Sequence, residues 1–188
     1  MKNEPVNAPG EAEQLKQFVF AIAAARRLLQ QANHTGCLIE GMALYASLAD
    51  GLLRIGLVLK HQLDQQTSNI PAGLLYQPAS TYISERQIYS RALASGIIGQ
   101  STFDELSDLY TQRNKAIHRF LISGITYNSL APFLERYEVL FKALFAIVYG
   151  LEKMQIDRGI GMTGRGNVSS EAQVWSEVRQ KIFGGPVQ

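Results

Sequence analysis

CLIEGMALYASLADGLLRIGLVL, residues 37–59, is the most apolar stretch of this 188-residue chain, and it decides the fold. The stretch approaches the length of a membrane span, but it carries charges at Glu40, Asp50 and Arg54. Charged side chains at such depths are costly in lipid. The pattern therefore predicts a central helix over about residues 35–65, buried in a protein core and not in a membrane.

Helical periodicity recurs on both sides of this segment, and long period-two alternation is absent from the sequence. Upstream, an apolar stripe predicts a helix over residues 11–31. Inside the central helix, Gly41, Gly51 and Gly56 lower the helix propensity, but they allow a neighbouring helix to come close. The central segment should therefore be covered by other helices.

Downstream of the central segment, a loop rich in proline precedes a short helix near residues 83–95. Ser101, followed by a carboxylate three residues later, resembles a capping box and predicts a helix that runs to about residue 122. A further helix is expected over residues 132–157, with Pro132 in its first turn. The sum is an all-α protein, an up-and-down helical bundle of four to five main helices with a short C-terminal helix.

The bundle is expected to occupy residues 1–158, and residues 159–188 are expected to form a glycine-rich linker and a short helix that packs on the bundle. Within the linker, residues 159–164 fit the pattern G-x-G-x-x-G. That pattern binds dinucleotides when it follows a strand, whereas here it follows a predicted helix. A linker is therefore the better interpretation.

Composition and charge limit the possible classes of function. Hydrophobic residues make up 46% of the chain and charged residues 18%, which is enough apolar material for a core and too much for a disordered chain. The net charge of +2 is too small to indicate a nucleic-acid partner by itself. Cys37 is the only cysteine, and it shows no metal-ligand spacing with the histidines. We expect a cytoplasmic protein with no metal and no cofactor.

The predicted fourth helix carries a charge where a core residue is expected. At about 100° per residue, Arg113 lies in the middle of an apolar stripe, while Asn114 and His118 share the adjoining flank. The stripe consists of Leu106, Leu109, Tyr110, Ile117 and Phe120. Burial of a lone guanidinium is very costly, so an anion or a wet cleft must meet Arg113. Such breaks in a pattern tend to mark functional or strained sites.

Two interpretations of Arg113 are open at this point. In the first, it forms a structural ion pair with Asp50 or Glu40 of the central helix. In the second, it lies in a groove that accepts an external anion. Residues 109–134 contain no Asp or Glu but carry a cluster of basic residues, namely Arg113, Lys115, His118 and Arg119. This local positive patch suits phosphate, although a solvated basic face would look the same.

The sequence LYTQRNKAIHRF, residues 109–120, resembles the signature helix of the HEPN superfamily. That signature is an arginine, a polar residue that is often asparagine, a few variable residues and a histidine, late in an α-helical bundle. Many members are metal-independent endoribonucleases, and some are toxins of toxin–antitoxin pairs. Others bind nucleotides or have lost activity. Members commonly dimerise so that two motif helices line one cleft.

The resemblance implies that Arg113, Asn114 and His118 are catalytic. RNA can be cut by its own 2′-hydroxyl, which attacks the adjacent phosphate and leaves a cyclic 2′,3′-phosphate and a free 5′-hydroxyl. His118 would transfer the protons, and Arg113 would stabilise charge on the phosphate. Asn114 would position the phosphate or the imidazole. Lys115 and Arg119 would bind neighbouring phosphates.

One chain supplies one histidine to this motif, whereas the reaction needs both an acid and a base. A symmetric homodimer would supply His118 of the second copy. Some family toxins, paired with a nucleotidyltransferase-like antitoxin, have a tyrosine two residues after the histidine. Phe120 stands there in this chain, which weakens the expectation of such an antitoxin partner. The alternative function is a non-catalytic helical module that binds a nucleotide, an RNA or a protein partner, with Arg113 as an anion ligand or an ion-pair anchor.

Overall fold

The computed structural model describes residues 10–77 and 82–164, and every regular element in that part of the chain is helical. The elements are α1 (Glu11–Thr35), α2 (Leu38–Gln65), α3 (Glu85–Ala94), α4 (Gln100–Arg119), the 3₁₀ turns η1 (Phe120–Ile122) and η2 (Tyr127–Leu130), α5 (Ala131–Arg158) and α6 (Gly161–Gly164). The prediction of an all-α helical bundle is confirmed.

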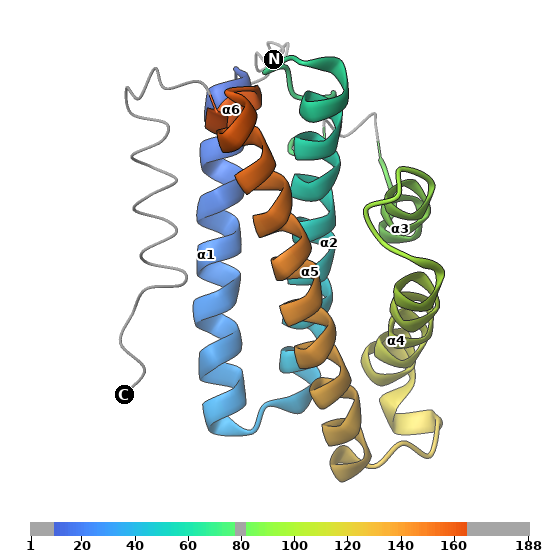
Figure 1. The fold of residues 1–188 in the computed structure, drawn as a ribbon. Helices are drawn as coiled ribbons and strands as arrows, with labels where there is room; N and C mark the ends of the chain where they lie inside the picture. Colours follow the sequence, from blue (N-terminus) through green and yellow to red (C-terminus); the bar gives the residue numbers. More distant parts are fainter. Residues whose placement is uncertain (1–9, 78–81, 165–188) are drawn as a thin grey trace, which may run out of the picture.

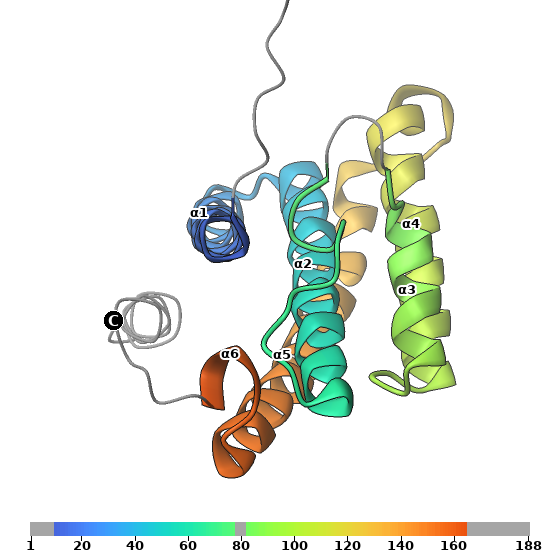
Figure 2. The ribbon, with the colours of Figure 1, turned by 90° about the horizontal axis from the view of Figure 1, so that it is seen from above.

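Helix α2 lies at the centre of the bundle. Helix α1 lies on one side of it and the α3–α4 pair on the other, while α5 runs along α2 in the same direction (Figures 1 and 2). Helix α2 is long and apolar enough to cross a membrane by length and composition, but 72% of its most apolar window is buried inside the bundle. Such burial is typical of the core helix of a soluble protein.

The three glycines of α2 lie where other helices approach, as predicted. A Cβ atom added to Gly51 or Gly56 would be 3.4 Å from the nearest side-chain atom, and one added to Gly41 would be only 2.7 Å away. The approaching side chains are Leu134 at Gly41, Ile22 at Gly51, and Ile97 and Val148 at Gly56. The glycines therefore allow α1, α5 and the α3–α4 turn to pack closely on α2.

Gly51 provides a test of this packing. An added Cβ atom would make an ordinary van der Waals contact with Ile22, and alanine is favoured over glycine within a helix by about 1 kcal/mol. We expect Gly51→Ala to raise the free energy of unfolding by roughly 0.5–1 kcal/mol, measured by urea denaturation. Gly41→Ala should raise the free energy of unfolding less, because the Leu134 side chain must move to make room for the methyl group. A decrease in stability in Gly51→Ala would show that α1 is packed too tightly to accept a methyl group.

The expected capping box at Ser101 and Asp104 is wrong. Helix α4 already includes Gln100 and begins after Gly99, so Ser101 lies within its first turn and cannot cap it. Asp104 instead accepts a hydrogen bond of 2.7 Å from the Gln100 side chain. A capping box is present one helix earlier, where the Ser84 side chain and Gln87 cap the start of α3.

The described part of the glycine-rich stretch, residues 159–164, packs on the bundle. Gly159 takes a left-handed conformation with φ of 63° and ends α5. In α6, which follows, Met162 packs against the core, and its backbone N–H donates to the Gln62 side chain at 3.2 Å. The predicted short C-terminal helix lies outside the described residues.

Candidate anion-binding site on α4

Helix α4 turns one apolar face into the bundle, as its stripe predicted, but the face drifts along the helix. Leu106 and Leu109 are buried, whereas Ile117, expected on the same stripe, is 38% exposed. In the last turns Ala116 is buried in its place. The end of α4 therefore leaves the core sooner than the pattern suggested, and its motif residues lie at the edge of the bundle.

Arg113 forms an ion pair within its own chain. Its Nη2 atom lies 2.5 Å from Oε2 of Glu85, in the first turn of α3, and the two side chains are 17% and 18% exposed. The guanidinium also lies 5.0 Å from the centroid of the Tyr110 ring, within the range of a cation–π contact. Arg113 is thus held at the junction of α3 and α4, partly covered.

The expected partners of Arg113, Asp50 and Glu40, are not the ones it has. Asp50 accepts a hydrogen bond of 2.6 Å from Arg54 on its own helix, and Glu40 is exposed near the start of α2. Periodicity gives the face of each helix but not the helix that packs against it. Glu85 becomes the partner because α3 packs against α4.

Further buried polar groups lie near the Arg113–Glu85 ion pair. Glu85 also accepts a hydrogen bond of 2.7 Å from the Tyr89 hydroxyl. Burial raises the pKa of Asp50 above its ordinary value, although the hydrogen bond and the charge of Arg54 oppose this shift. Within the described chain, Arg113 Nε, Asp50 Oδ1 and the Tyr137 hydroxyl are buried without a hydrogen-bond partner. The guanidinium therefore has donor capacity that Glu85 does not use.

The other motif residues face outward. Asn114 is half-buried, and Lys115, His118 and Arg119 are exposed. No hydrogen bond or salt bridge ties these four side chains to another residue in the described part of the chain. His118 lies in the last turn of α4, five residues after Arg113 and therefore about 140° around the helix. The structure thus brings Arg113 together with α3 and leaves His118 open to solvent.

Two features of this surface were missed by the sequence analysis. Arg86, next to Glu85 in α3, places its guanidinium 5.0 Å from the centroid of the same Tyr110 ring. Directly after α4, Leu121 and Ile122 are 93% and 82% exposed. No sequence motif marks Glu85 or Arg86. Their contacts with α4 become evident only from the packing of α3 on α4.

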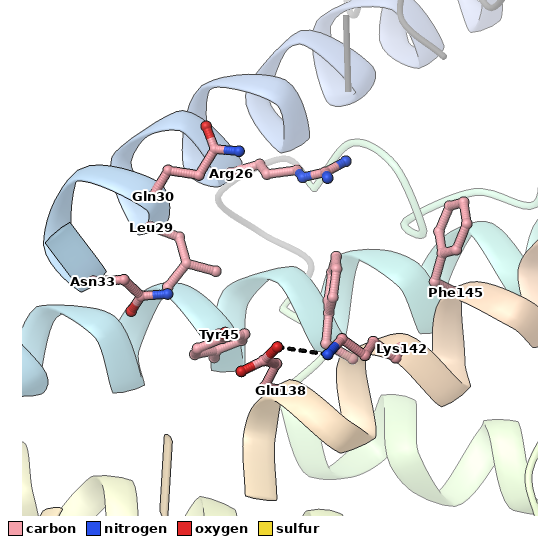
Figure 3. A pocket seen from close by; sticks show the side chains of 9 residues that line it. Arg26, Leu29, Gln30, Asn33, Tyr45, Glu138, Lys142 and Phe145 are labelled. Carbon is pink, nitrogen blue, oxygen red and sulfur yellow. Dashed lines mark hydrogen bonds and ion pairs between the residues drawn. The ribbon is translucent and has the colours of Figure 1, made fainter. Parts of the chain in front are cut away.

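Three pockets formed by described residues lie away from the motif. One, of about 320 Å³, lies between α1 and α5, and its lining includes Arg26 and Asn33 of α1, Tyr45 of α2 and the Glu138–Lys142 ion pair of α5 (Figure 3). Two others lie between α4 and α5 and at the α1–α2 turn. Among the described residues, no group of three or more His, Cys, Asp or Glu side chains could hold a metal ion.

The fold and this surface define a helical bundle with a basic, partly apolar edge at the end of α4. No family model, no curated protein and no solved structure matches the chain.

Proposed function

We propose that this chain is a metal-independent endoribonuclease of the HEPN type, which cleaves RNA in the cytoplasm at the surface formed by α4 and η1. One observation carries the proposal. Arg113 is held in a fixed position at the bundle edge by Glu85 and Tyr110, while His118 on the same helix is open to solvent with no partner in the described chain. The proposed phosphate chemistry needs both a cation held in place and an accessible proton carrier, and α4 supplies one of each.

Each motif residue has a role in the proposed reaction. His118 transfers a proton to or from the reacting oxygens. Arg113 stabilises the charge that develops on the phosphate. Asn114 positions the phosphate or the imidazole, and Lys115 and Arg119 contact neighbouring phosphates. The reaction yields a cyclic 2′,3′-phosphate and a free 5′-hydroxyl.

The experiment that tests this proposal is RNA cleavage in excess chelator. The full chain is incubated with single-stranded RNA, and the product ends are identified. We expect cleavage that leaves cyclic phosphates and 5′-hydroxyls, because the 2′-hydroxyl of the RNA is the nucleophile. An RNA left intact, or one cut only after a divalent metal is added, would contradict the proposal.

The proposed enzyme acts as a homodimer, because acid and base require two histidines. Leu121 and Ile122 form an exposed apolar surface within four residues of His118, and such surfaces are typical of protein contacts. We expect Leu121→Asp with Ile122→Asp to shift a dimer to monomers in sedimentation experiments and to remove cleavage. Val139→Asp is the control, since Val139 is 69% exposed on α5. Cleavage by a chain that is monomeric would contradict the proposal that the active enzyme is a homodimer.

A second function, the non-catalytic helical module, is favoured by the Arg113–Glu85 pair itself. A carboxylate already neutralises the guanidinium at 2.5 Å inside one chain, as a structural anchor would. In that case the basic edge of α4 binds a nucleotide, an RNA or a protein such as an antitoxin without cleavage. Variants of Glu85 separate the two functions.

A further inference from the structure

Arg86 and Arg113 flank the same aromatic ring. Arg86 lies in the first turn of α3 and Arg113 in the second half of α4, yet each guanidinium carbon is 5.0 Å from the centroid of Tyr110. A cation–π contact at an exposed site stabilises one position of a guanidinium by about 0.5–1 kcal/mol. The junction of α3 and α4 therefore brings two guanidinium groups to one tyrosine.

The two cations differ in how they are neutralised. Arg113 is paired with Glu85 and is mostly covered, whereas Arg86 is exposed. In the part of the chain that the structure describes, no carboxylate lies within salt-bridge distance of Arg86. Arg86 is thus the cation at this junction that can accept an external anion without first breaking an ion pair.

We propose that Arg86 is a phosphate-binding residue of the RNA site, which extends the site from α4 onto α3. This inference rests on the proposed function, because it takes RNA as the ligand. A guanidinium binds two phosphate oxygens at once, and a side chain already fixed on Tyr110 loses little entropy when it does so. In this proposal the RNA strand contacts the basic residues of α4 and places a further phosphate on Arg86.

The test measures RNA binding apart from cleavage. A fluorescently labelled oligouridine is titrated at several salt concentrations against the full chain carrying His118→Ala, so that the RNA stays intact. The logarithm of the binding constant falls linearly with the logarithm of the salt concentration. For single-stranded RNA, each phosphate contact that is lost makes this slope shallower by about 0.7. We expect Arg86→Ala to weaken binding several-fold at low salt and to reduce the slope by about that amount.

The matched control is Arg91→Ala, which removes the same charge from an exposed position later in α3. The two variants should have equal thermal stability, since neither side chain is buried. If Arg86→Ala and Arg91→Ala bind alike, or if the parent chain does not bind the oligouridine, the inference is overturned. Binding that depends on Arg86 in a chain that never cleaves RNA would support it while refuting the nuclease. If cleavage is unchanged in Arg86→Ala, the proposed ribonuclease activity stands, but the proposed role of Arg86 in phosphate binding is refuted.

Discussion

Replacing His118 with alanine will reduce RNA cleavage roughly 10²- to 10⁴-fold, the usual contribution of a general acid or base. The proposed reaction needs a proton carrier at the 2′-hydroxyl and another at the leaving 5′-oxygen. A symmetric dimer supplies both from one residue type, so a single substitution removes both. The fold should be unaffected, because His118 is exposed and makes no hydrogen bond or salt bridge within the described chain.

His34→Ala is the matched control for this experiment. His34 is also an exposed histidine in the last turn of a helix, but it lies in α1. Both variants should melt at the temperature of the parent chain, and only His118→Ala should lose cleavage in chelator. Equal activity of the two variants would remove His118 from the mechanism.

Replacing Glu85 with glutamine will separate the two proposed functions. The substitution removes a charge-assisted hydrogen bond at a partly buried pair, so we expect the free energy of unfolding to fall by about 2 kcal/mol. If Arg113 serves RNA, its release from Glu85 will also tighten RNA binding several-fold at low salt, because a competing carboxylate is gone. If Arg113 is only an anchor, stability will fall with no gain in binding.

Glu105→Gln controls for the change in net charge. Glu105 lies on α4 and binds Arg136 through two hydrogen bonds of 2.8 Å, so this variant also removes a charge-assisted interaction. Arg136 keeps a second carboxylate partner, Asp108, at 2.7 Å. Tighter RNA binding in Glu85→Gln alone would assign the effect to Arg113. The same gain in both variants would assign the effect to net charge and would support the non-catalytic module, in which Arg113 is only an ion-pair anchor.

The amino-acid sequence alone was enough to predict a helical bundle built around α2. The 23 residues from Cys37 to Leu59 are too apolar for a surface helix and too charged for lipid, so other helices must cover them. Gly51 and Gly56 indicated where those helices come close, and the structure confirms both approaches. These features are local in sequence, because a helix period and a glycine each act within a few residues.

The contacts of Arg113, in contrast, depend on how the helices pack. Its position on an apolar stripe showed that it needed a partner, but the partner, Glu85, lies 28 residues away on a helix whose placement no periodicity encodes. The same packing of α3 on α4 brings Arg86 to Tyr110. Periodicity fixes the face of each helix, whereas the choice between neighbouring helices depends on how all their apolar faces fit together.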